Sequence, residues 1–254
     1  MAPISNASLE SGEPTLTLLH GFTNTSETWG SFRTQLEQAY GVEALDLPGH
    51  GKNHATRQNL VDYGHFLAEQ LIDPTVLIGY SLGGRVALHS ALEEPPGLRG
   101  LVLIGATAGI EDVQERDARR QSDNQLAEGL RHSNDLQAFL ERWLDGPLFS
   151  RLRDEDRHLS GRLQNTVEGL ASSLELMGVG TQVPLWSELH RISVPTLVLA
   201  GEEDAKFTAL GQRMADAIPQ AEFCSIRGAG HAVHLEEPEL TAQEVKRFVE
   251  RLFG

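Results

Sequence analysis

The motif Gly79-Tyr80-Ser81-Leu82-Gly83 constrains the fold most, because it lies between two segments of different periodicity. Residues 75–80 form an apolar, β-branched run that is typical of a buried strand, and residues 85–92 have the spacing of an amphipathic helix. A Gly-x-Ser-x-Gly motif at such a junction predicts a nucleophile elbow, a sharp turn that exposes the serine hydroxyl above a parallel sheet. Glycine fits both outer positions because neighbouring backbone comes too close for a Cβ atom, and the N–H of Leu82 would face a developing oxyanion.

Strands and helices alternate along most of the chain, which predicts an α/β fold with a mostly parallel central sheet flanked by helices. The expected strands are residues 15–19, 42–47, 75–80, 101–105, 195–201 and 221–226. The expected helices of this part are residues 29–40, 59–72, 85–92, 206–217 and 239–253. From 109 to 190 no strand pattern occurs, and the helix-favouring stretches are 111–130, 135–144 and 154–177. We therefore expect a core of residues 1–108 and 191–254, interrupted by a helical cap at residues 109–190.

Two polar side chains follow late strands of the predicted sheet. Asp204 comes just after the strand expected at 195–201, and His231 comes just after the strand expected at 221–226. The carboxyl ends of parallel strands meet at the edge where such sheets bind ligands. A serine hydroxyl needs an imidazole to accept its proton, and the imidazole needs a carboxylate to orient it. We predict that Ser81, Asp204 and His231 form a catalytic triad, in the chain order of α/β-hydrolases.

Neighbouring residues offer alternatives for two members of this triad. Glu202 and Glu203 compete with Asp204 for the role of the acid. His234 is the nearest rival of His231, but it lies three residues further along and should point elsewhere on a helical turn. Asp46 is expected to be a turn residue.

The composition excludes several classes of partner. A net charge of −15 argues against nucleic acid and anionic membranes, because both require a cationic surface. The single cysteine, Cys224, lies in an apolar run and is expected to be a buried thiol without a disulfide partner. No signal sequence and no apolar run of membrane-spanning length is found, so we expect a cytoplasmic protein without membrane insertion. The histidines and carboxylates lack the spacing of metal motifs, and no cofactor is expected. The sequence leaves the oligomeric state open.

Four motifs resemble those of the α/β-hydrolase superfamily over most of the core. They are Leu19-His20-Gly21-Phe22, Asp46-Leu47-Pro48-Gly49-His50-Gly51, Gly79-Tyr80-Ser81-Leu82-Gly83-Gly84-Arg85 and Gly228-Ala229-Gly230-His231. The resemblance implies that the N–H groups of Phe22 and Leu82 form an oxyanion hole, and that His20 shapes the loop that carries Phe22.

Further motifs, most of them in the cap, resemble the 2-succinyl-6-hydroxy-2,4-cyclohexadiene-1-carboxylate synthases of menaquinone biosynthesis. They are Glu115-Arg116-x-x-Arg119, Trp143 with Pro147-Leu148-Phe149, Arg162-Leu163-x-Asn165, Leu170-Ala171 and Gly201-Glu202-x-Asp204-x-Lys206-Phe207. Residues 104–109 depart from the family, which usually has a glutamate and a proline there.

The resemblance to the synthases implies a reaction and a substrate class. Such enzymes are carbon–oxygen lyases that eliminate pyruvate from 2-succinyl-5-enolpyruvyl-6-hydroxy-3-cyclohexene-1-carboxylate, with the triad removing a proton. Arg119 and Arg162 would hold carboxylates of this small-molecule polycarboxylate, because a guanidinium pairs bidentately with a carboxylate. Tyr80 and Trp143 would line the pocket. Arg116 and Arg120 are possible substitutes for these arginines, whereas Arg85 is expected to be a structural cap or loop anchor.

Two other functions are compatible with the same core. A serine carboxylesterase or thioesterase would use Ser81 as a nucleophile and form an acyl-enzyme. A non-catalytic ligand sensor would keep the fold and the pocket without turnover.

Overall fold

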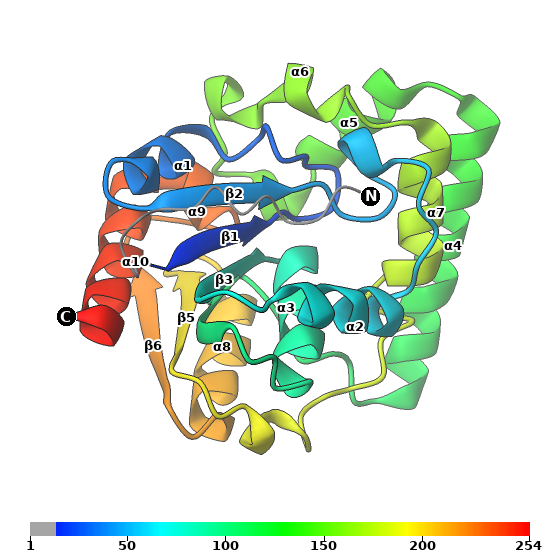
Figure 1. Cartoon of the computed structure of the whole chain (residues 1–254). Coiled ribbons are helices and arrows are strands. Elements are labelled where there is room, and N and C mark those ends of the chain that lie inside the picture. The colour runs from blue at the N-terminus through cyan, green and yellow to red at the C-terminus, as the bar shows by residue number, and fades with distance from the viewer. Residues whose placement is uncertain (1–13) are drawn as a thin grey trace.

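The structure is a computed structural model that describes residues 14–254. Its central element is a six-stranded, fully parallel sheet (Figure 1). The strands are β1 (Thr15–Leu19), β2 (Gly41–Leu45), β3 (Thr75–Tyr80), β4 (Leu98–Ile104), β5 (Thr196–Gly201) and β6 (Ala221–Ile226). Their order across the sheet is β2-β1-β3-β4-β5-β6. All six predicted strands are confirmed; β4 begins three residues earlier than predicted. The α/β fold with a parallel sheet is therefore also confirmed.

Helices cover both faces of the sheet (Figure 1). The helices of the core are α1 (Gly30–Glu37), α2 (Leu60–Gln70), α3 (Leu82–Leu92), α8 (Ala205–Ala217), α9 (Val233–Glu236) and α10 (Pro238–Phe253). Short 3-10 turns lie at η1 (Gly51–Asn53) and η4 (Leu189–Arg191). Helices α2, α3 and α8 pack on one face, whereas α1, α9 and α10 pack on the other. This arrangement buries both faces, as a parallel sheet requires.

Side chains of the central strands alternate between two apolar clusters. On β4, Leu101 and Leu103 belong to the cluster under α2, α3 and α8, and Val102 and Ile104 belong to the cluster under α1 and α10. Each of these four side chains is fully buried. Because burial of a large aliphatic side chain contributes about 1.5–3 kcal/mol, the continuous apolar runs of the sequence determine where the sheet forms.

The cap is helical in this structure, and residues 105–195, all of them described, contain no strand. Its elements are α4 (Val113–Ser133), α5 (Leu136–Leu144), η2 (Pro147–Phe149), η3 (Asp154–Arg157), α6 (Leu159–Arg162) and α7 (Val167–Met177). The stretch 154–177 is divided into three elements, because His158 has a left-handed φ of 46° and Thr166 caps the N-terminus of α7. The exact boundaries of core and cap at residues 109 and 190 remain a prediction.

Asn165 connects the cap to the core. Its side-chain amide donates to the carbonyl oxygen of Thr23 at 2.8 Å, and its Oδ1 accepts from the N–H of Gly51 at 3.0 Å. Asn165 is 4% exposed, so both hydrogen bonds are made away from water. The cap is therefore held on two loops that follow the carboxyl ends of β1 and β2.

Cys224 differs from its expected environment. It is only partly buried, because β6 is the edge strand of the sheet and no strand within residues 14–254 pairs with its outer side. Partial burial still raises the pKa of its thiol, and the nearby Glu244 and Glu222 raise the pKa further. Among the helices within residues 14–254, none combines the length and the apolar character that a membrane-spanning segment needs.

Gly83 makes the tightest backbone contact of the elbow, and we predict how its replacement changes the stability of the protein. A Cβ atom on Gly83 would lie 1.9 Å from the carbonyl oxygen of Leu19, which is backbone at the end of β1 and cannot move aside. We expect Gly83→Ala to lower the free energy of unfolding in urea by about 3 kcal/mol or more. Gly129 is the matched control, because it lies exposed in α4 and a Cβ there would meet nothing within 4 Å. Gly129→Ala should raise stability by up to about 1 kcal/mol; equal effects at the two sites would contradict the proposed packing.

Candidate active site

Ser81 lies at the junction of β3 and α3, in a backbone conformation that residues other than glycine rarely adopt. Its φ is 51° and its ψ is −105°. The turn is held from both sides, because the N–H of Ser81 donates to the carbonyl oxygen of Ile104 at 2.8 Å and the N–H of Arg85 donates to the carbonyl oxygen of Ser81 at 3.2 Å. Such a conformation costs about 1–3 kcal/mol and is kept where the surroundings enforce it. Ser81 therefore has the backbone geometry of a nucleophile elbow.

Asp204 and His231 are in direct contact. The Nδ1–H of His231 donates to Oδ2 of Asp204 at 2.9 Å, and the N–H of Phe207 donates to Oδ1 of Asp204 at 3.1 Å. Burial alone would raise the pKa of Asp204, but these hydrogen bonds and the charges of His231 and Lys206 together lower it. An ionised Asp204 can only accept, which fixes the proton on Nδ1 and leaves Nε2 of His231 free to take a proton.

The rival residues have other partners. Glu202 accepts from the N–H of Gly228, and Glu203 lies 4.0 Å from Arg151. His234 is fully buried beneath the Tyr80 ring at a centroid distance of 4.3 Å, and burial lowers its pKa well below the ordinary value. A neutral ring in this environment packs against its aromatic neighbours Trp29, Phe32 and Tyr80.

His20 and Asp46 hold the loops beside the elbow. His20 Nδ1–H donates to the carbonyl oxygen of Gly21 at 2.8 Å, and its Nε2 accepts from the N–H of Leu47 at 3.1 Å. Burial lowers the pKa of His20 to about 4, so the ring is neutral and can make both hydrogen bonds. Asp46 accepts from the N–H groups of Ser26 and Lys52, as its expected role in a turn requires. The loop that carries Phe22 is thereby fixed against the neighbouring loop.

A cavity of about 160 Å³ lies between the elbow and the cap. Ser81 and His231 both line it, and so do Phe22 and Leu82, the expected carriers of the oxyanion hole. Leu82 begins α3, so its N–H is one of the first-turn groups that have no partner inside the helix. Other lining residues include Gly105, Ala106 and Thr107, from the segment that departs from the family pattern, and Trp143, Ser173, Met177 and Phe207.

The cavity is cationic. Arg85, Arg119 and Lys206 line it, and among its described lining residues there is no aspartate or glutamate. Arg119 Nε–H donates to Oδ1 of Asp123 at 2.9 Å, behind the wall, where Asp123 is 4% exposed. Arg85 donates to the carbonyl oxygen of Met177 at 2.7 Å. Burial and the charge of Arg119 lower the pKa of Arg85 to about 9, so it is still a cation at neutral pH.

Two of the four expected substrate-binding residues lie outside the cavity lining. Arg162 is 1% exposed, and its guanidinium donates to the carbonyl oxygen of Arg157 at 2.8 Å and to Oγ1 of Thr23 at 2.5 Å. Its short helix α6 packs on the loop after β1, which directs the side chain into that loop. Tyr80 is 2% exposed and packs behind His231 at a ring distance of 5.5 Å. In this structure Arg162, which is expected to hold a substrate carboxylate, and Tyr80, which is expected to line the pocket, are thus both absent from the residues that line the cavity.

Arg119 and Trp143 line the cavity, where their contacts with substrate stay a prediction, and two cations that were not assigned to substrate binding line it as well. Trp143 lies in the wall with its ring 5.1 Å from that of Phe22. Arg85 was expected to be only an anchor, yet it both anchors Met177 and lines the cavity. For Lys206 the sequence analysis names a motif but no role. Its position indicates a place near the site, because it lies two residues after Asp204, in the first turn of a helix that begins at the same sheet edge.

Comparisons with known proteins place the chain in a family. A family model described as the alpha/beta hydrolase family matches residues 18–244. The chain is 38% identical to the 2-succinyl-6-hydroxy-2,4-cyclohexadiene-1-carboxylate synthase of Salmonella typhimurium, over 89% of this chain and 90% of that protein. It is 35% identical to a protein described as a putative synthase of the same name from Bacillus subtilis, over 91% of this chain and 88% of that protein.

Solved structures agree with these relatives. The structure of MenH from S. aureus aligns with a TM-score of 0.88 at 30% identity, covering 98% of this chain and 97% of that chain. A thermophilic esterase from Thermogutta terrifontis aligns with a TM-score of 0.81 at 25% identity, covering 95% of this chain and 91% of that chain. The chain therefore belongs to the alpha/beta hydrolase family and, within it, to the group that contains the 2-succinyl-6-hydroxy-2,4-cyclohexadiene-1-carboxylate synthases.

Proposed function

We propose that the chain is a carbon–oxygen lyase that eliminates pyruvate from 2-succinyl-5-enolpyruvyl-6-hydroxy-3-cyclohexene-1-carboxylate in menaquinone biosynthesis. The observation that carries the proposal is the charge of the cavity beside Ser81. Arg85, Arg119 and Lys206 line a site without a described acidic residue, although the whole chain has a net charge of −15. Such a local excess of cations suits a small substrate with several carboxylates. The names of the Salmonella and S. aureus relatives support the same reaction.

In the proposed mechanism, Ser81 is the base that removes a ring proton. His231 Nε2 takes the hydroxyl proton of Ser81 as the serine oxygen takes the proton from the substrate, and Asp204 stabilises the resulting imidazolium. The electron pair of the broken C–H bond at C2 forms a double bond between C2 and C3, the ring double bond moves from C3–C4 to C4–C5, and the C–O bond between C5 and the enolpyruvyl group breaks. The departing enolate of pyruvate takes the proton from Nε2 of the His231 imidazolium, which restores the neutral ring. The N–H groups of Phe22 and Leu82 would stabilise negative charge that develops on a substrate oxygen during this step.

The roles of the remaining predicted residues follow from their positions. Trp143 would cover the ring of the substrate. Its buried Nε1–H has no hydrogen-bond partner among the described residues and would donate a hydrogen bond to the substrate. Arg119 would pair with one carboxylate through the part of its guanidinium that Asp123 does not use. Arg162 and Tyr80 would act from behind the wall, Arg162 by holding the cap on the loop after β1 and Tyr80 by packing against His231.

The alternative function is that of a serine carboxylesterase or thioesterase. The likeness to the Thermogutta esterase favours it, because an acyl-enzyme mechanism would use the same elbow, histidine and oxyanion hole. The substrate then differs in charge, since a simple ester does not need three cations in the wall.

The test compares two substrates with one preparation of the protein. We expect stoichiometric pyruvate release from the enolpyruvyl precursor, measured by coupling to lactate dehydrogenase, and a kcat/KM for a p-nitrophenyl ester that is lower by about a hundredfold or more. The charge of the cavity is the reason for this preference. Efficient ester hydrolysis without release of pyruvate would refute the lyase proposal and favour the esterase.

A further inference from the structure

The loop that carries His231 is fastened by a single side chain from the following helix. Glu236, the last residue of α9, accepts from the N–H of Gly230 at 2.5 Å through Oε2 and from the N–H of Ala232 at 2.9 Å through Oε1. These two N–H groups flank His231 in the chain. Each oxygen of one carboxylate thus holds the backbone on one side of the histidine.

The loop has few other hydrogen bonds that could fix it. Residues 227–232 belong to no helix or strand. Gly228 donates to Glu202, and the carbonyl oxygen of Ala229 accepts from the N–H of Glu203 at 2.9 Å, but both contacts precede Gly230. From Gly230 to Ala232, the carbonyl oxygen of Ala232 accepts from the N–H groups of Leu235 and Glu236 at the start of α9. The N–H groups of Gly230 and Ala232, on either side of His231, are held by the carboxylate of Glu236.

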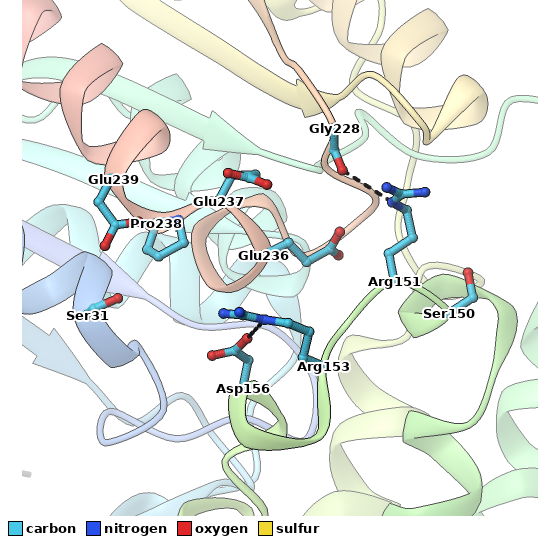
Figure 2. Close-up of a pocket in the computed structure, with 10 residues that line it drawn as sticks. All are labelled: Ser31, Ser150, Arg151, Arg153, Asp156, Gly228, Glu236, Glu237, Pro238 and Glu239. Carbon is cyan, nitrogen blue, oxygen red and sulfur yellow. Dashed lines mark hydrogen bonds and ion pairs between the residues drawn. The ribbon is translucent and has the colours of Figure 1, made fainter.

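Figure 2 shows the same loop from the groove on its outer side, where the Glu236 side chain points toward the segment that follows Gly228. Arg151 of the cap reaches this segment from the other direction and donates to the carbonyl oxygen of Gly228 at 3.2 Å (Figure 2). The groove has a volume of about 620 Å³ and is also lined by Glu239, whose side chain is exposed. Glu236 differs from Glu239 in that both of its oxygens are occupied by the loop.

We propose that Glu236 is a positioning residue for His231. It does not touch the substrate; it fixes the backbone on both sides of His231, so that Nδ1 stays on Asp204 and Nε2 faces the cavity. A carboxylate suits this task because it has two acceptor oxygens and no donor, and its hydrogen bonds to N–H groups are charge-assisted. A glutamine has one acceptor oxygen, and its NH₂ group would face a backbone N–H. This inference rests on the role proposed above for His231.

The test uses Glu236→Gln and Glu236→Ala, with Glu239→Gln as the control from the same groove. We expect the kcat for pyruvate release to fall about tenfold in Glu236→Gln and about a hundredfold in Glu236→Ala, because small displacements of a reacting group have effects of this order. The KM should stay within about twofold, since no substrate contact is lost. Glu239→Gln should match the wild-type protein in both constants.

A second readout does not depend on turnover. The Nδ1–H proton that His231 shares with Asp204 should give a low-field signal in the proton NMR spectrum, assigned by its absence from Asp204→Asn. This signal should weaken from the wild type to Glu236→Gln to Glu236→Ala. An unchanged signal and a wild-type kcat in a folded Glu236→Ala would overturn the inference. If the wild-type protein releases no pyruvate, the proposed function fails, and the NMR comparison alone decides the role of Glu236.

Discussion

Replacing Ser81 with alanine should lower the kcat for pyruvate release by about a thousandfold, because general-base catalysis contributes about 10²–10⁴-fold. The change removes one oxygen atom from the wall of the cavity and leaves the elbow hydrogen bonds intact, since both are made by backbone groups. Arg85, Arg119 and Lys206 also remain in place. The KM for the precursor should therefore change by less than about threefold. Rapid-mixing kinetics with the coupled pyruvate assay would measure both constants.

The strained backbone of Ser81 provides the control for this experiment. At a φ of 51° and a ψ of −105°, glycine is far less strained than serine or alanine. Ser81→Gly should lose as much activity as Ser81→Ala, yet its free energy of unfolding should be higher by about 1 kcal/mol, once the entropic cost of glycine is subtracted from the strain. If Ser81→Gly is more stable than Ser81→Ala but equally inactive, the strained backbone serves to position the hydroxyl group of Ser81. If Ser81→Ala keeps more than a tenth of the wild-type kcat, Ser81 is not the base.

The sheet and the elbow were predictable because their signals are local. A continuous apolar run such as 75–80 can be satisfied only by burial on both faces, and this requirement places a strand wherever the run occurs. Asp204 and His231 followed from the same logic, because the carboxyl ends of parallel strands share one edge. Their contact at 2.9 Å connects residues that are 27 positions apart.

The wall of the cavity was less predictable, because it depends on how the cap lies on the core. Arg119 and Arg162 carry the same signal in the sequence, a guanidinium on a polar helical stretch. In the structure, Arg119 faces the cavity, whereas Arg162 is directed to Thr23 by the contact of α6 with the loop after β1. For Arg85 the sequence indicated the reverse. Its place just after the elbow predicts an anchor, whereas in the structure it contacts Met177 at the end of α7 and also lines the cavity.

The division of residues 154–177 has a similar cause. Its composition favours helix throughout, but His158 adopts a left-handed φ of 46° and ends the first turn. The turn that follows α6 brings Asn165 to the core, where it bonds with Thr23 and Gly51. Long-range hydrogen bonds of this kind override weak helix propensity, and no periodicity in the sequence announces them.

Replacing Arg119 with glutamine should raise the KM for the enolpyruvyl precursor by about a hundredfold, with a smaller effect on kcat. A charge-assisted hydrogen bond contributes about 1.5–3 kcal/mol, and the upper part of this range corresponds to that change. Lysine at the same position should recover only part of the loss, because an ammonium lacks the planar fork that pairs with a carboxylate. Steady-state kinetics over a wide range of precursor concentrations would give the two constants separately.

Arg120→Gln is the matched control, because Arg120 lies next to Arg119 on α4 but forms an exposed ion pair with Asp117 at 2.9 Å. Exposed pairs contribute little, so its KM should stay within about twofold of the wild-type value. Asp123→Asn addresses the geometry: it keeps the guanidinium of Arg119 but replaces the carboxylate that orients it, and should raise KM by about tenfold. The increase in KM should thus be larger when the charge of Arg119 is lost than when only its orientation is disturbed. A wall that binds a carboxylate requires this order. Equal KM values for Arg119→Gln and Arg120→Gln would remove Arg119 from the site and leave Arg85 and Lys206 to bind the substrate.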